Sequence, residues 1–123
     1  MKVAVYGSLR KGMGNHKYHL GDAKYLGTEQ TSEKFKMFSL GGFPAVVPDC
    51  RGYPVTVEVY EIDEAYHLPR LDRLEGYPHF YNRMPMSTSH GEAWIYYIDS
   101  PDRSFQTEVN SGDWVEFYNQ RYS

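Results

Sequence analysis

The feature that most constrains the fold of this 123-residue chain is a change of hydrophobic periodicity near its middle. Residues 54–62 carry valine at every second position from 55 to 59, which is the pattern of a β-strand. Soon afterwards Leu68, Leu71 and Leu74 recur at three-residue spacing, which marks one face of a helix. The chain is therefore predicted to combine a sheet with at least one helix.

Shorter strand-like runs surround this central pair of elements, at residues 3–6, 25–29, 34–40, 45–47, 81–87 and 91–98. Ser111, Gly112 and Asp113 precede aromatic residues at helical spacing and predict a capped helix that closes the chain. Six or more short strands with one or two helices predict an α+β fold, namely a compact, mixed β-barrel-like sheet with helices at its side. We expect residues 1–123 to form one domain, because no linker or repeat interrupts them.

Charge and cysteine content exclude several classes of partner and compartment. The net charge of -3 gives no general attraction to nucleic acid or to an anionic membrane. Cys50 is the single cysteine, so no disulfide can form within the chain. The sequence contains no apolar run of membrane-spanning length and no signal-peptide core, and we expect a cytoplasmic protein.

The first candidate site follows the first strand directly and comprises Tyr6, Gly7, Ser8 and Leu9. We expect Gly7 to adopt backbone angles that are closed to other residues. Successive N–H groups in such a turn can point inward together and bind a carboxylate or an oxyanion. The alternative is an ordinary turn that binds nothing, and these four residues taken alone favour that alternative.

The second candidate is Glu75, at the end of the predicted helix. Leu71 and Leu74 are expected to bury one side of that helix, and Gly76 and Pro78 are expected to end it. A carboxylate held there against the sheet would have a raised pKa and could shuttle a proton. The alternative is a solvated glutamate at a helix end, where the helix dipole prefers a cation.

Other kinds of site lack their signatures. Gly12 and Gly14 do not form part of a phosphate-binding glycine motif, and Ser8 lacks the nucleophile elbow of a serine hydrolase. The five histidines, of which His16 and His19 lie three residues apart, show no spacing typical of zinc ligands. We therefore expect neither a metal nor an organic cofactor.

Taken together, the two candidate segments resemble one known family. Residues 5–16 are similar to the opening of the gamma-glutamylcyclotransferase-like superfamily, and above all to its gamma-glutamylamine cyclotransferase branch, which opens Tyr-Gly-Thr-Leu and continues to Asn-His. Residues 71–83 resemble the second signature of this family, Leu-Asp…Glu-Gly…Tyr-x-Arg, and residues 57–62 resemble its Gly-x-Val-Tyr strand. The resemblance extends from about residue 3 to residue 98 and is loose beyond that.

This resemblance implies a small β-barrel flanked by helices, with a cavity at one end. It implies that Glu75 is the catalytic acid/base and that Tyr81 lines the pocket. Ser8 stands where the closest branch has threonine, and the substitution keeps the hydroxyl group. The residues that match the substrate-binding loop of the family are Tyr6, Gly7, Ser8 and Leu9.

The activity implied by the resemblance is the release of 5-oxoproline and a free amine from a γ-glutamyl amide, a small-molecule substrate. The alternatives are a related acyl-removing or amide-forming enzyme on the same fold and a binding module without catalysis. The leaving group stays open among glutathione, a γ-glutamyl amino acid and a γ-glutamyl amine such as a lysine isopeptide. The oligomeric state is open as well.

Overall fold

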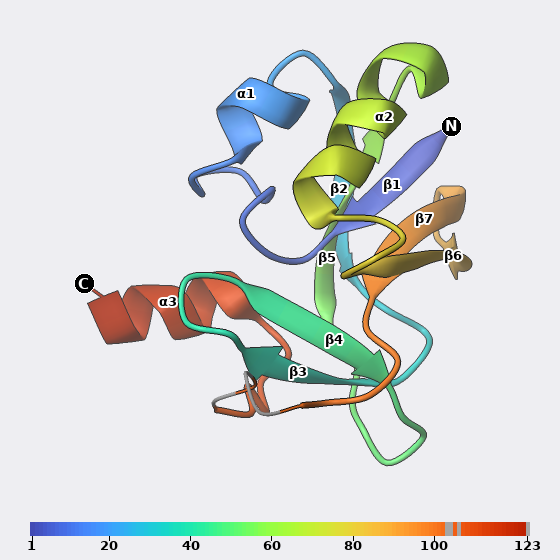
Figure 1. Ribbon diagram of the computed structural model, residues 1–123. Coiled ribbons are helices and arrows are strands. Elements are labelled where there is room, and N and C mark those ends of the chain that lie inside the picture. The colour runs from blue at the N-terminus through green and yellow to red at the C-terminus, as the bar shows by residue number, and fades with distance from the viewer. Residues whose placement is uncertain (103–104, 106, 123) are drawn as a thin grey trace.

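The computed structural model describes residues 1–102, 105 and 107–122, and within them seven strands and three helices (Figure 1). The predicted α+β class is confirmed. In chain order the elements are β1 (Lys2–Val5), α1 (His16–Leu20), β2 (Lys24–Gln30), β3 (Phe35–Ser39), β4 (Pro44–Pro48), β5 (Thr56–Glu61), α2 (Glu64–Glu75), β6 (Asn82–Thr88), β7 (Gly91–Tyr97) and α3 (Trp114–Tyr122).

The strands form two sheets. The larger sheet has the order β2-β5-β1-β7-β6, in which β1 is antiparallel to β5 and parallel to β7. The smaller sheet pairs β3 with β4, and the N–H of Ile98 joins the two sheets by donating to the carbonyl of Val46 at 3.0 Å. In the described part of the chain β2 and β6 are the edges of the larger sheet, so its hydrogen-bonded ladder does not close into a barrel.

The helices lie around these sheets. In Figure 1, α1 and α2 are neighbours over the larger sheet, and α3 extends beside β3 and β4. Trp114, the first residue of α3, is fully buried and packs into the same core cluster as Phe35 and Val46 of the smaller sheet. None of the helices in the residues described is long and apolar enough to span a membrane.

Strand β5 is buried on both faces. Val57 and Val59 are fully buried, as their spacing predicts, but Glu58 and Tyr60 on the opposite face are also only 6% and 2% exposed. The reason is that the loop after β1 and helix α1 cover this second face, where the ring of His16 lies 5.5 Å from that of Tyr60. A carboxylate is thereby enclosed inside the protein.

Helix α2 begins and ends at clear signals. The side chain of Asp63 accepts a hydrogen bond from the N–H of Tyr66 at 2.8 Å and caps the first turn. Gly76 ends the helix in the left-handed conformation, with φ of +68°, as predicted. Pro69 lies inside the helix, six residues after the cap at Asp63.

The prediction of which face of α2 is buried is only partly correct. Of the three leucines in the pattern, Leu71 is fully buried, whereas Leu74 is 37% exposed. The buried partner of Leu71 is His67, one turn earlier. A three-residue step falls short of the 3.6 residues of one turn, so a strict three-residue repeat drifts around the helix and carries Leu74 away from the core.

Helix α1 is absent from the expectations drawn from the sequence. It spans five residues and buries only Leu20, so it has no apolar stripe to reveal it.

At the other end of the chain, the predicted cap is confirmed, because Asp113 accepts a hydrogen bond from the N–H of Glu116 at 3.2 Å. The start of α3 was therefore predictable and α1 was not.

Candidate active site

A cavity of about 310 Å³ opens at the end of β1. Its wall is formed by the loop after β1, the segment that leads into β4, the C-terminal end of α2, and aromatic residues near β6 and β7. All of the residues that the sequence singled out for a site line this one cavity, namely Tyr6, Gly7, Ser8, Leu9, Glu75 and Tyr81.

Gly7 is required for a reason other than the expected one. Its φ does not lie in the left-handed region, so the expectation of unusual backbone angles was wrong. A Cβ atom at this position would instead lie 2.7 Å from Cδ and 2.8 Å from Cγ of Pro44. Glycine therefore permits a close approach between the loop and the first residue of β4, whose ring is rigid.

The loop that begins at Gly7 is a turn with unpaired backbone N–H groups. The N–H of Arg10 donates to the carbonyl of Gly7 at 3.0 Å, and the N–H of Asn15 donates to the carbonyl of Ser8 at 3.0 Å. Within the described residues, the N–H groups of Gly7, Ser8 and Leu9 find no acceptor. Donors of this kind are suited to an anionic group in the adjacent cavity.

Asn15 orients the hydroxyl group of Ser8. Its side-chain amide donates to Ser8 Oγ at 2.9 Å, and both residues line the cavity. Since the oxygen of Ser8 accepts this bond, its own proton remains available for another acceptor. Asn15 was not among the site residues expected from the sequence, although Asn-His forms part of the segment that resembles the family opening.

Glu75 is the last residue of α2. Among the described residues that line the cavity, it is the one with a carboxyl group. Burial raises the pKa of this carboxyl group to about 7. Within the residues described, no side chain or N–H donates a hydrogen bond to it that would favour the ionised form. Both protonation states are therefore populated near neutral pH, which suits a group that accepts and returns a proton.

Three buried tyrosines stand around this carboxyl group. The hydroxyl of Tyr6 donates to the carbonyl of Tyr96 at 2.9 Å, and that of Tyr81 donates to the carbonyl of Pro44 at 2.7 Å. Burial above all, with a contribution from the charge of Glu75, raises the pKa of each phenol well above its usual value. The three phenols are thus neutral and held in place, and they form a fixed wall.

Asp72 holds the helix that carries Glu75 against the larger sheet. Its carboxylate accepts from the hydroxyl of Tyr96 at 2.7 Å and from Nε of Arg83 at 2.9 Å. The guanidinium of Arg83 also lies over the rings of Tyr77 and Trp94, 4.3 and 4.5 Å from their centroids. Asp72 and Arg83 belong to the segment that resembles the second family signature, but the sequence indicated no role for them and gave no sign of Tyr96.

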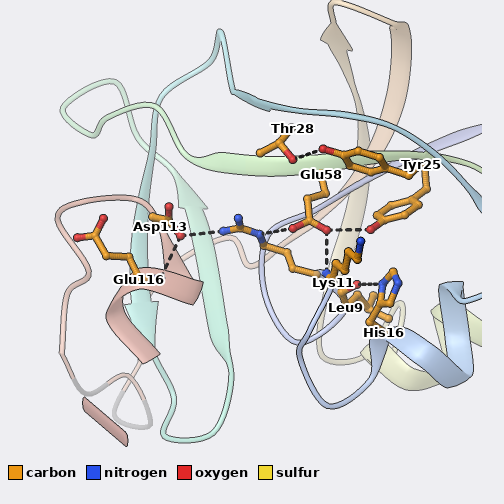
Figure 2. A network of polar contacts seen from close by, with 10 residues as sticks. Leu9, Lys11, His16, Tyr25, Thr28, Glu58, Asp113 and Glu116 are labelled. Carbon is orange, nitrogen blue, oxygen red and sulfur yellow. Dashed lines mark hydrogen bonds and ion pairs between the residues drawn. The ribbon is translucent and has the colours of Figure 1, made fainter. Parts of the chain in front are cut away.

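A second polar network lies behind the loop (Figure 2). The guanidinium of Arg10 donates through Nε to Oε2 of Glu58 at 2.9 Å and through Nη1 to Oδ1 of Asp113 at 2.8 Å. Oε1 of Glu58 accepts from the backbone N–H of Lys11 and from the hydroxyl of Tyr60, both at 2.8 Å. The network therefore joins the loop to β5 and to the start of α3.

The described residues include no group of three or more histidine, cysteine, aspartate or glutamate side chains that could hold a metal ion. The cavity itself offers one carboxyl group, phenols, an amide, a hydroxyl and backbone donors from the part of the chain that the structure describes. Groups of these kinds are able to bind a small polar molecule and to move a proton.

Known proteins resemble this chain along most of its length. The family model described as gamma-glutamyl cyclotransferase, AIG2-like, matches residues 3–116. A provisionally named gamma-glutamylcyclotransferase of Methanocaldococcus jannaschii is 38% identical, and the match covers 94% of this chain and 96% of that protein. The gamma-glutamylcyclotransferase family protein YtfP of Escherichia coli is 35% identical, and the match covers 94% of this chain and 97% of that protein. The crystal structure of an uncharacterized protein from Pyrococcus horikoshii superimposes with a TM-score of 0.82 at 30% identity, covering 99% of this chain and 96% of that one. The chain therefore belongs to the gamma-glutamyl cyclotransferase, AIG2-like family.

Proposed function

We propose that this protein is a cyclotransferase that converts a γ-glutamyl amide into 5-oxoproline and a free amine. The observation that carries this proposal is the position of Glu75, a carboxyl group with a pKa of about 7, in one cavity with the unpaired N–H donors of the loop after β1. Membership of the family supports the same reaction class.

In the proposed reaction, the α-amino nitrogen of the substrate attacks its own γ-carbonyl carbon. A new C–N bond closes the five-membered lactam, and the bond from the γ-carbon to the amide nitrogen breaks. The nucleophile belongs to the substrate, so the protein needs neither a reactive serine nor a reactive cysteine. Its first task is to hold the glutamyl chain in the folded, attacking geometry, which alone can contribute a large rate enhancement.

Glu75 would move the proton. As a carboxylate it takes a proton from the α-ammonium group, and as a carboxylic acid it gives that proton to the leaving nitrogen. The attacking nitrogen loses a second proton as the lactam forms, and the released amine takes up a proton to become an ammonium ion. A pKa of about 7 makes both directions accessible at neutral pH. The net reaction consumes no other reagent, and no step in it calls for a metal or an organic cofactor.

The loop after β1 would bind the negatively charged part of the substrate. The N–H groups of residues 7–9 and the hydroxyl of Ser8 are donors that no described residue uses, and these residues line the cavity. They suit the α-carboxylate of the substrate or the oxyanion that develops on the γ-carbonyl oxygen. The tyrosine wall formed by Tyr6, Tyr81 and Tyr96 would enclose the methylene groups of the glutamyl chain.

The proposal is tested by measuring 5-oxoproline and released amine over a panel of L-γ-glutamyl amides that includes the methylamide. We expect equal amounts of the two products from the L-γ-glutamyl compounds and none from D-γ-glutamyl or β-aspartyl analogues. The β-aspartyl compound is one methylene short and would have to close a strained four-membered ring. Binding of the amides without any turnover would contradict the proposal and would indicate a binding module.

A further inference from the structure

We propose that Asp72 is a positioning residue for the proton transfer: it accepts the hydroxyl proton of Tyr96 and thereby leaves Glu75 without a hydrogen-bond donor among the described residues. This inference rests on the proposed function, in which Glu75 moves the proton. It assigns a role to a side chain that does not itself line the cavity. It follows from where the protons of the buried hydroxyl groups go.

Each tyrosine of the cavity wall has one hydroxyl proton to donate, and each donates it to an acceptor within the protein. Tyr6 donates to the carbonyl of Tyr96 at 2.9 Å, and Tyr81 donates to the carbonyl of Pro44 at 2.7 Å. The acceptor of the Tyr96 hydroxyl is instead a side chain, because it donates to Oδ1 of Asp72 at 2.7 Å. Of the three bonds, this one depends on the identity of a second side chain.

Two neighbouring strands hold Asp72 in place for this task. Arg83 of β6 and Tyr96 of β7 are direct partners in the antiparallel ladder, so their side chains leave the sheet on the same face. Oδ1 of Asp72 accepts from Nε of Arg83 at 2.9 Å as well as from Tyr96, and Oδ2 accepts from Nη2 of Arg83 at 3.2 Å. Arg83 thus fixes the carboxylate opposite the Tyr96 hydroxyl.

Glu75 is the competing acceptor for this hydroxyl proton. It follows Asp72 by three residues on α2, and side chains at that spacing are neighbours on a helix surface. Tyr96 and Glu75 also line the same cavity. Burial above all, then the bond to Asp72 and finally the charge of Glu75 raise the pKa of Tyr96, so the two groups lie within electrostatic reach. Because a buried hydroxyl without an acceptor is unfavourable, we expect it to turn to Glu75 when Asp72 is removed.

A hydrogen bond from Tyr96 would stabilise the ionised form of Glu75 and lower its pKa. Burial raises this pKa to about 7 in the present arrangement. The other ionisable groups around the cavity are engaged, since Tyr6 and Tyr81 have carbonyl partners and Arg83 binds Asp72. The described lining residues of the loop after β1 and of the segment that leads into β4 carry no ionisable side chain. Asp72 thereby preserves a base strong enough to take a proton from an ammonium group.

The test is a titration of the Glu75 carboxyl group by carbon-13 NMR in the folded protein. In Asp72→Ala the pKa of Glu75 should fall by about one unit or more, which is the scale of one hydrogen bond to a charged group. Asp72→Asn removes the same charge but keeps an oxygen in place of Oδ1, where both Arg83 and Tyr96 donate, so it should leave the pKa close to that of the wild type. Equal shifts in the two variants would overturn the inference, because the lost charge would then be the cause.

The double variant Asp72→Ala/Tyr96→Phe tests whether the hydroxyl of Tyr96 carries the effect. Phenylalanine has no hydroxyl proton to donate, so the pKa of Glu75 should return toward the wild-type value. A pKa that stays low in the double variant would show that the released Arg83 acts on Glu75 instead, and the inference would be wrong.

Tyr96→Phe alone tests the inference without any change at Asp72, and so does not require Asp72→Ala to fold. The pKa of Glu75 should stay close to 7 in this variant, because the hydroxyl that is removed does not donate to Glu75. A rise of about one unit would show that it does, and would contradict the inference. Asp49→Ala is the control, since Asp49 also binds an arginine but does not line the cavity, and it should leave the pKa unchanged.

The assay with γ-glutamyl methylamide links these titrations to the reaction. In Asp72→Ala the rise of kcat/KM with pH should move to lower pH by the same amount as the pKa of Glu75, whereas Asp72→Asn should keep the wild-type midpoint. The NMR titration needs no turnover, so the two proposals fail in different ways. If the wild type converts no γ-glutamyl compound, the proposed function is wrong. If it converts the methylamide but the pKa of Glu75 does not move in Asp72→Ala, the reaction stands and only the role of Asp72 is wrong.

Discussion

Arg10 and Glu58 form a buried ion pair, with Nε 2.9 Å from Oε2, directly behind the loop that lines the cavity. Glu58 also accepts from the backbone N–H of Lys11, so its carboxylate holds two consecutive residues of the loop. Asp113 binds the other side of the guanidinium and ties the loop to α3. The loop is thus fixed from behind by residues that do not line the cavity.

Removing one charge of this network should loosen the loop. For Glu58→Gln we expect a loss of about 1–3 kcal/mol in the free energy of unfolding, because the buried guanidinium keeps Asp113 but loses the other of its two charged partners. At a temperature where the variant is folded, KM for the γ-glutamyl methylamide should rise while kcat changes less, since Glu75 is untouched. Urea denaturation and steady-state kinetics measure the two effects.

The matched control is Arg51→Gln, which breaks an exposed ion pair with Asp49. The side chain of Arg51 is 78% exposed, and such pairs contribute about 1 kcal/mol or less. Equal stability losses in the two variants, or an unchanged KM in Glu58→Gln, would show that the network does not position the loop.

The contact between Gly7 and Pro44 gives a second prediction. A Cβ atom at Gly7 would lie 2.7 Å from Cδ of Pro44, and the carbonyl of Pro44 holds the hydroxyl of Tyr81 in the cavity wall. Gly7→Ala should therefore force β4 and the loop apart, destabilise the protein by about 1–3 kcal/mol and lower kcat/KM. Thermal denaturation and the 5-oxoproline assay measure both effects.

Gly14→Ala serves as the control for this prediction. Gly14 lies in the same loop region, does not have a positive φ, and has no described atom within 4 Å of the point that a Cβ atom would occupy. Its replacement should change the free energy of unfolding by about 0.5 kcal/mol or less. If Gly7→Ala were as mild as Gly14→Ala, close packing would not be the reason for glycine at position 7.

The regular elements were predictable where the sequence carries a local signal. The alternating valines of β5, the Gly76 that ends α2 and the Asp113 that begins α3 each act within a few residues of where they stand. Helix α1 has no such signal, because five residues with a single buried leucine show no periodicity. The helix depends on tertiary packing for its stability.

The sequence pointed to residues that line the cavity but not to the residues that hold them in place. Short motifs marked the loop and Glu75, and the fold brings them to one cavity. The network behind the loop joins Arg10 to Glu58 and Asp113, which are 48 and 103 positions away in sequence, and no local pattern relates them. The role of Gly7 was misjudged for the same reason, since its constraint comes from Pro44 and not from its own backbone angles.

Burial of Glu75 predicts a dependence of stability on pH. The pKa of about 7 in the folded protein exceeds the 4.5 of an exposed glutamate, so the folded state binds this proton more tightly than the unfolded state. The stabilisation is fully present below pH 4.5 and is lost as pH rises through 7, by up to about 3 kcal/mol.

The measurement is the difference in unfolding free energy between the wild type and Glu75→Gln, determined with urea at pH 5 and pH 8. Glutamine cannot ionise, so the wild type should lose unfolding free energy relative to Glu75→Gln as pH rises from 5 to 8. A difference that stays constant over this range would mean that Glu75 titrates as an exposed residue.

The most direct test of the central claim is the pH profile of kcat/KM for γ-glutamyl methylamide in the wild type and in Glu75→Gln. In the wild type, kcat/KM should rise about tenfold per pH unit below a pKa of about 7 and level off above it, because the free enzyme must hold Glu75 ionised. Folded Glu75→Gln should be slower by about a hundredfold or more and should lack this rise. A folded Glu75→Gln protein that retains wild-type turnover, or a wild-type profile with no inflection near pH 7, would contradict the assignment of Glu75 as the acid/base.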